Sequence, residues 1–240
     1  MPPVFCHDAV ARILAADAPV LFLDTCAVLD LLRSPIRDSI RHHDIDAAHT
    51  LLVRAEAQPQ QLVLIVNQQT SDEFTEHVDK VEEEAAKELQ KLTEKIGGIL
   101  TRMRAFPTAT DIPATIDLTA FGFPGHGRNV ADRIMRTGLM VEDSDGEYVK
   151  AVRRVQMAAP PATRGKQSVK DCLITETYLR IAAELTASGF RRNKVFITSN
   201  KVDYEQNHSS LHPALRQEFS AAALEYAPSW SAARHEIDRA

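Results

Sequence analysis

The sequence is poor in cysteine. Its 240 residues contain three, Cys6, Cys26 and Cys172, and no two of them form a CxxC pair. This spacing excludes a disulfide framework. Cys26 and Cys172 each lie close to a carboxylate considered below, but the simpler expectation is that the cysteines are small buried side chains in a reducing compartment.

Long apolar runs are also missing. No stretch of about 18 consecutive apolar residues occurs, so we expect no membrane span. Residues 1–20 carry acidic side chains, and they lack the basic start and the continuous apolar stretch of a signal peptide. We therefore expect a cytoplasmic protein that does not contact a membrane.

An excess of positive charge is missing as well. The chain has 28 Lys and Arg against 33 Asp and Glu, which gives a net charge of −5. This balance disfavours a protein that wraps nucleic acid with a uniformly basic surface. It is compatible with a local basic rim around an acidic pocket, because net charge hides the distribution of charge.

Short apolar runs separated by helical segments carry the fold prediction. Residues 19–23 and 61–66 read as buried strands, a third strand lies within residues 193–200, and residues 222–227 are a candidate last strand. Uninterrupted apolar strands bounded by helices are typical of a parallel sheet covered on both faces. The sequence therefore predicts an α/β fold.

The chain between the second and third strands is unusually long. The spacing of apolar residues predicts a helix from about Ser71 to Met103, followed by an irregular connection rich in proline and glycine over residues 104–128. Helical segments are expected at 128–140 and 146–157. We predict a single domain over residues 1–240, with a helical insertion at roughly 74–165.

Four carboxylates occupy related positions in this scheme. Asp24 ends the first strand, and Glu73 lies in the first turn of the long helix after the second strand. Asp171 lies in the first turn of the helix before the third strand, and Asp203 follows that strand by a few residues. Because the carboxyl ends of parallel strands converge on one crevice, we expect these acids to meet there.

Helix capping is a competing explanation for three of the acids. The pairs Thr70–Glu73, Ser168–Asp171 and Asn200–Asp203 all have the spacing of a capping box, in which the acid bonds to its own helix start. Taken singly, capping explains each pair at least as well as a shared site does. It does not explain Asp24, which ends a strand.

The four acids together predict a metal site. Carboxylates crowded into one crevice repel and raise one another's pKa, and a divalent cation removes that problem. A site with only oxygen ligands suits Mg²⁺ or Mn²⁺ better than zinc. Such a site can activate water and stabilise an in-line displacement at phosphorus.

Four segments place these acids in a wider pattern, and together they resemble the PIN domain family (the PilT N-terminus fold). They are "VLFLDTCAVLDLL" at 20–32, "NQQTSDEF" at 67–74, "SVKDCLITETYL" at 168–179 and "VFITSNKVDYE" at 195–205. The family's acids match Asp24, Glu73, Asp171 and Asp203 in order. The resemblance implies a Rossmann-like three-layer α/β/α fold and endonucleolytic cleavage of RNA with Mg²⁺ or Mn²⁺.

Other site residues follow from the same reading. Thr25, Thr198 and Asn200 are expected to orient the metal ligands or water. Arg164, Lys166 and Lys170 lie near Asp171 in the sequence, where they either contact substrate phosphates or balance the acidic cluster. Arg33, Arg37 and Arg41 either extend a basic track or are ordinary charges on helix ends, and Asp30 is expected to be a surface charge.

Two other functions remain open. A catalytically silent PIN-like module would bind RNA or a protein without cleavage. A phosphatase of the haloacid dehalogenase type also begins with an apolar strand ending in Asp, but it requires a second Asp two residues later, where this chain has Cys26. The expected binding partner is RNA, with DNA as the alternative. A second copy of this chain or an inhibitory protein is a further candidate partner. The long gap between Glu73 and Asp171 is unlike that of small toxin nucleases.

Overall fold

The centre of the molecule is a parallel sheet of five strands. The computed structural model describes residues 3–33, 37, 40–106, 111–163, 168–207 and 210–239. All neighbouring strands of this sheet pair in parallel, in the order β3-β2-β1-β4-β7. The strands are β1 (Val20–Leu23), β2 (Val63–Asn67), β3 (Leu139–Val141), β4 (Lys194–Ile197) and β7 (Glu225–Ala227), and a separate short hairpin joins β5 (Glu205–Gln206) to β6 (Ser210–Leu211).

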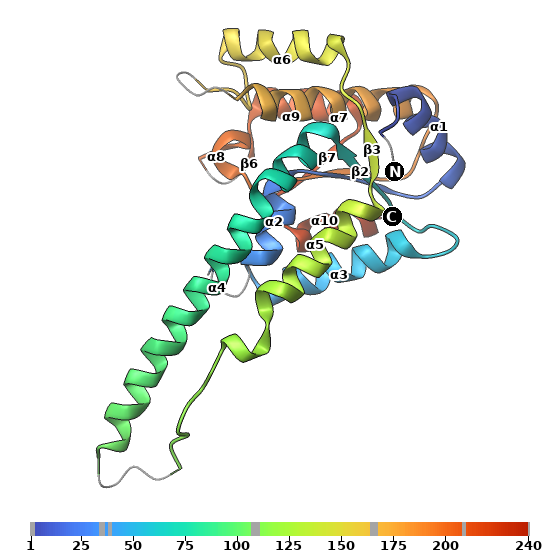
Figure 1. Cartoon of the computed structure of the whole chain (residues 1–240). Coiled ribbons are helices and arrows are strands. Elements are labelled where there is room, and N and C mark those ends of the chain that lie inside the picture. The colour runs from blue at the N-terminus through green and yellow to red at the C-terminus, as the bar shows by residue number, and fades with distance from the viewer. Residues whose placement is uncertain are drawn as a thin grey trace.

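Helices cover both faces of the sheet (Figure 1). They are α1 (Cys6–Ala16), α2 (Thr25–Arg33), α3 (His42–Glu56), α4 (Gln68–Arg104), the 3-10 turn η1 (Thr119–Phe121), α5 (Phe123–Thr137), α6 (Asp145–Met157), α7 (Val169–Ala187), α8 (Lys201–Tyr204), α9 (Pro213–Ala222) and α10 (Trp230–Asp238). None of the described helices is both long enough and apolar enough to cross a membrane.

Alternate residues of each strand point to opposite faces and build two separate cores. In β1, Leu21 and Leu23 join the core that packs under α2, α3, α5 and α10, whereas Val20 and Phe22 join the core under α1, α7 and α9. Every residue of β1 is buried, as expected for a strand covered on both sides. The predicted three-layer α/β/α fold with a parallel sheet is confirmed.

Helix α4 is the long helix that the apolar spacing predicts. It has 37 residues, and the side chain of Asn67 caps its start by accepting a hydrogen bond from the backbone of Thr70. The first half of its apolar stripe is buried against the body, whereas Leu92, Ile99 and Met103 are exposed. Figure 1 shows the far half of α4 extending beyond the sheet, with the chain returning alongside it to α5.

The strand β3 was not predicted. Residues 128–140 read as one helix in the sequence, but α5 ends at Thr137 and Leu139–Val141 pairs with β2. Gly138 separates the two elements because the backbone passes close to β2 there: a Cβ at this position would lie 2.5 Å from Val66 Cγ2. Glycine is also a poor helix former, which favours the end of α5 at this point.

Strand register brings the site residues to one edge of the sheet. Leu23 at the end of β1 is aligned with Val66 of β2 and with Ile197 of β4. The next residues along the three strands, Asp24, Asn67 and Thr198, are therefore neighbours at the carboxyl edge.

Candidate metal centre at the carboxyl edge of the sheet

Asp24 is the most deeply buried of the four predicted acids. It follows β1 directly, its side chain is 2% exposed, and its backbone N–H donates to Ile197 O across the sheet at 3.1 Å. Thr198 Oγ1 donates to Asp24 Oδ2 at 2.5 Å. Burial raises the pKa of Asp24 to about 7, the bond from Thr198 opposes that rise, and the charges of Asp171 and Glu73 add to it.

Glu73 is held toward Asp24 by the neighbouring residue Thr25. Thr25 begins α2, and its Oγ1 lies 3.0 Å from Glu73 Oε2, to which it donates. On its other side, Glu73 Oε1 lies 3.7 Å from Lys170 Nζ of α7. Lys170 also pairs with Glu76, with 3.9 Å between Nζ and Oε2. Lys170 thus pairs with two carboxylates of α4.

One face of α7 supplies Asp171 and its supports. Asp171, Thr175 and Tyr178 follow the helical spacing of four and three residues, which aligns them along the helix. Thr175 Oγ1 donates to the backbone oxygen of Asp171 at 2.8 Å. The buried hydroxyl of Tyr178 donates to Leu23 O at 2.7 Å and accepts from Asn67 N at 3.0 Å. These bonds fix α7 against the ends of β1 and β2.

Asp203 is linked to Asp24 through two polar residues. Asn200 N donates to Thr198 Oγ1 at 3.0 Å, and Asn200 Nδ2 donates to Asp203 Oδ2 at 2.7 Å. Thr198 in turn donates to Asp24, so a continuous set of hydrogen bonds joins the first and last acids. Asp203 lies in the short helix α8 and is 4% exposed.

The capping explanation fails for all three helices. Helix α4 begins at Gln68 with Asn67 as its cap, so Glu73 lies beyond the first turn and contacts Thr25 instead. Ser168 and Asn200 stand at the starts of α7 and α8, but neither side chain makes a capping hydrogen bond. None of the three helices therefore has the predicted capping box, and Asp203 instead accepts a hydrogen bond from the side chain of Asn200.

The chemistry of these donors fits a divalent cation of the Mg²⁺ or Mn²⁺ kind. Asp24, Glu73 and Asp171 offer only carboxylate oxygens, and the charges of the last two raise the pKa of the first. In the part of the chain that the structure describes, however, no three His, Cys, Asp or Glu side chains are already arranged around a metal position.

The comparison with known families agrees with this geometry. The sequence model of the PIN domain family matches residues 21–204, well over half of the chain. The chain belongs to the PIN domain family. PIN domains are generally metal-dependent nucleases, and the matched span contains all four acids. No curated protein and no solved structure matches the chain.

Several other predicted residues can now be placed in this PIN domain. Arg164 and Lys166 lie outside the described residues. Asp30, expected to be a surface charge, is 15% exposed in its side chain and pairs with Arg33 and Arg37. Cys6 and Cys172 are buried and Cys26 is half-buried, and all three are free thiols.

Two residues that support the PIN domain site, the half-buried Asp143 and the buried Tyr178, were missed in the sequence. Asp143 follows β3, and its Oδ1 accepts hydrogen bonds from Thr177 Oγ1 at 2.8 Å and from the side chain of Asn67. Burial raises the pKa of Asp143. In the sequence, Asp143 is recognisable only as an acid that follows a short apolar run. That run was not predicted to be the strand β3, so Asp143 was not placed at the edge of the sheet. Tyr178 had no signal, since its partners Leu23 and Asn67 are distant in sequence.

Replacing Thr198 by Val is expected to weaken the site without changing its shape. The variant loses the hydroxyl that donates to Asp24 and accepts from Asn200 N, and the carboxylate of Asp24 stays buried without this donor. We expect metal affinity or nuclease activity to fall about 10- to 100-fold, and the free energy of unfolding to fall by about 1–3 kcal/mol. Titration of metal binding and urea unfolding measure the two effects.

Thr50→Val is the matched control for this experiment. Thr50 Oγ1 bonds only to Asp46 O within α3, away from the acids. This variant should keep wild-type metal affinity. Equal metal affinities in the Thr198 and Thr50 variants would contradict a supporting role for Thr198.

Proposed function

We propose that this PIN domain is a Mg²⁺- or Mn²⁺-dependent endoribonuclease that hydrolyses phosphodiester bonds at the carboxyl edge of the sheet. The observation that carries the proposal is the buried carboxyl of Asp24, whose pKa is raised to about 7 beside two further acids. A bound cation would supply Lewis acidity toward the phosphate and would favour ionised water as the nucleophile. The choice of RNA over DNA rests on the family resemblance.

The residues of the chain have distinct tasks in this proposal. Asp24, Glu73, Asp171 and Asp203 hold the cation. Each of three polar residues orients one of these carboxylates through a hydrogen bond. Thr198 orients Asp24, Thr25 orients Glu73, and Asn200 orients Asp203.

Charge balance around the acids is a separate task. Lys170 offsets part of the negative charge through Glu73, and Arg164, Lys166 and Lys170 remain proposed phosphate contacts.

Two broader predictions belong to the same proposal. The chain acts as a single domain over residues 1–240, with a helical insertion at roughly 74–165, between β2 and β4 in the sequence, that also contains the sheet strand β3. The free thiols Cys6, Cys26 and Cys172 support a reducing compartment such as the cytoplasm.

A catalytically silent binding module is the second candidate. It is favoured by the ion pair between Lys170 and Glu73, which satisfies one of the acids without a metal. The haloacid dehalogenase alternative has no comparable support, because the chain belongs to the PIN domain family.

Cleavage assays distinguish these functions. The protein is incubated with labelled single-stranded RNA, structured RNA and DNA of the same sequence, each in Mg²⁺, Mn²⁺ or EDTA. We expect internal cleavage of RNA in Mg²⁺ or Mn²⁺ and none in EDTA. Cleavage that persists in EDTA contradicts the metal mechanism, and cleavage of DNA alone contradicts the assignment to RNA. Absence of cleavage under every condition favours the binding module.

A further inference from the structure

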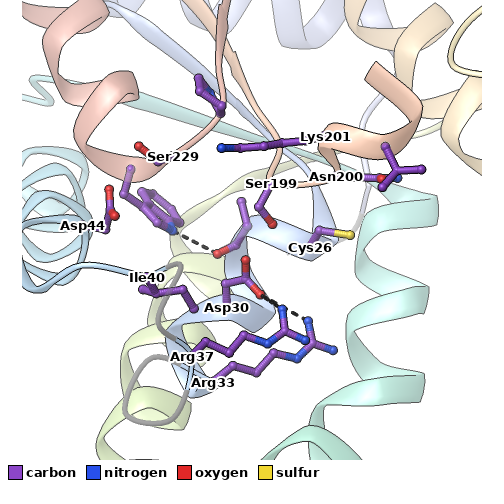
Figure 2. A pocket seen from close by; sticks show the side chains of 14 residues that line it. Cys26, Asp30, Arg33, Arg37, Ile40, Asp44, Ser199, Asn200, Lys201 and Ser229 are labelled. Atoms are coloured by element: carbon purple, nitrogen blue, oxygen red, sulfur yellow. Dashed lines mark hydrogen bonds and ion pairs between the residues drawn. The ribbon is translucent and has the colours of Figure 1, made fainter. Parts of the chain in front are cut away.

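A hollow of about 330 Å³ adjoins the acidic cluster (Figure 2). Its walls come from α2, from the turn between β4 and α8, and from the start of α10. Two of its lining residues connect it directly to the acids. Cys26 lies two positions after Asp24, and Asn200 donates hydrogen bonds to Thr198 and Asp203. The hollow is therefore a direct neighbour of the acidic cluster.

Two arginines stand on one wall of the hollow and are held by a single carboxylate. Arg33 Nη1 lies 3.3 Å from Asp30 Oδ1, and Arg37 Nη1 lies 3.1 Å from the same oxygen. The side chains of Arg33 and Arg37 are 23% and 47% exposed, so neither guanidinium is fully covered. Because a guanidinium has five N–H donors, each arginine retains donors for an oxyanion after bonding to Asp30.

Lys201 stands on the opposite wall. Figure 2 shows its side chain across the hollow from Arg33 and Arg37, beyond Ser199. Lys201 is exposed, and no carboxylate of the described chain lies within ion-pair distance of its ammonium group.

The charges around the hollow favour an anion. Asp44 also lines it, but Asp44 Oδ1 is occupied by hydrogen bonds from Ser231 N at 3.0 Å and Ser231 Oγ at 2.6 Å. Among the described lining residues there are three cations and two acids, a positive excess in a chain whose net charge is −5. A local positive excess of this kind attracts phosphate.

We propose that this hollow binds a phosphate group of the polynucleotide next to the one at the acids, with Arg33, Arg37 and Lys201 as its contacts. This proposal rests on the proposed function only for the position of the cleaved bond. Guanidinium groups bind phosphate oxygens through paired N–H donors, and lysine adds a point charge. The volume of about 330 Å³ is near the lower end for small-molecule sites and suits one unpaired nucleotide.

Binding measured without metal tests the proposal separately from catalysis. The full chain in EDTA is titrated into a short, fluorescently labelled single-stranded RNA, and into DNA of the same sequence, at several salt concentrations. Arg33→Gln and Lys201→Gln are each expected to weaken binding about tenfold. Each should also lower the slope of log affinity against log salt by about 0.7, because one phosphate contact is lost.

Matched variants separate a phosphate contact from a general change in charge. Arg192→Gln removes an exposed arginine that pairs with Asp17 next to the amino end of β4, far from the acids along that strand. Its affinity and salt slope should remain those of the wild type. Arg33→Lys keeps the charge and should restore most of the slope. Lys201 is exposed, so its replacement tests the hollow even if the Arg33 variants unfold.

Each outcome has a defined meaning. Wild-type affinity and slope in both Arg33→Gln and Lys201→Gln would overturn the phosphate site, even in a protein that cleaves RNA. Absence of binding to RNA and DNA would overturn it as well. Weakened binding in both variants supports the site even if no metal gives cleavage, and in that case the proposed nuclease function alone fails. Binding of DNA but not RNA supports the site and identifies the polymer as DNA.

Discussion

Replacing Asp24 by Asn is expected to reduce metal-dependent cleavage of RNA by at least about 100-fold. Mutating a residue that only hydrogen-bonds to a metal ligand already lowers activity by up to about 100-fold, and loss of the ligand itself should lower it at least as much. Asn keeps the shape of the side chain and can still accept the hydrogen bond from Thr198, but it cannot carry the negative charge that holds a divalent cation. Single-turnover cleavage of labelled RNA in Mg²⁺ and Mn²⁺ measures the effect.

Asp46→Asn provides the control for this loss of charge. Asp46 lies on α3, where it pairs with Arg234 at 2.7 Å and is 69% exposed. We expect wild-type cleavage from this variant. If Asp24→Asn cleaves RNA as fast as Asp46→Asn does, the metal site is not where the buried carboxyl lies.

The same Asp24→Asn variant is expected to be more stable than the wild type at pH 8 in EDTA. The pKa of Asp24 is raised from 3.8 to about 7 in the folded protein, so the folded state favours the neutral carboxyl. Below pH 3.8 the carboxyl is protonated in both states and costs nothing. As the pH rises through 7, the folded carboxyl must ionise in its buried position. The wild type then loses the stability that its neutral carboxyl has at low pH. At about 1.4 kcal/mol for each pKa unit, the variant should gain roughly 2–4 kcal/mol at pH 8.

Urea unfolding at pH 4 and pH 8 measures this difference. The gain should be nearly absent at pH 4, where the folded wild type carries a neutral carboxyl and the variant a neutral amide at the same position. Mg²⁺ or Mn²⁺ should stabilise the wild type at pH 8 and leave the variant nearly unchanged, since ligands stabilise only the state that binds them. Equal stability of the two proteins at pH 8 in EDTA would show that the ionised carboxylate of Asp24 does not destabilise the folded protein.

The main strands and the position of Asp24 at their common edge could be predicted because they depend on patterns that are local in sequence. Strands β1, β2 and β4 are uninterrupted apolar runs, since both of their faces are buried. Once they are parallel, a residue such as Asp24 that follows a strand must lie at the common edge. Strand β3 escaped prediction because three residues after Gly138 give no recognisable pattern.

Contacts between distant segments could not be predicted. The spacing Thr70–Glu73 imitates a capping box, but α4 begins three residues earlier than that pattern requires. Only the folded chain shows that Asn67 is the cap and that Glu73 bonds to Thr25. The partial burial of Asp30 has the same origin, because Arg37 reaches it from beyond the end of α2.

The hydroxyl of Tyr178 has a consequence for the shape of the site. Along β1 and β2 the backbone ladder includes a bond from Val63 N to Pro19 O, and its regular continuation would reach Asn67 N and Leu23 O. The hydroxyl accepts from the first of these atoms and donates to the second, so one phenol oxygen replaces the last rung of the ladder. The phenol of Tyr178 thus stands between β1 and β2 where Asp24 begins, and it joins the ends of the two strands at the acidic cluster.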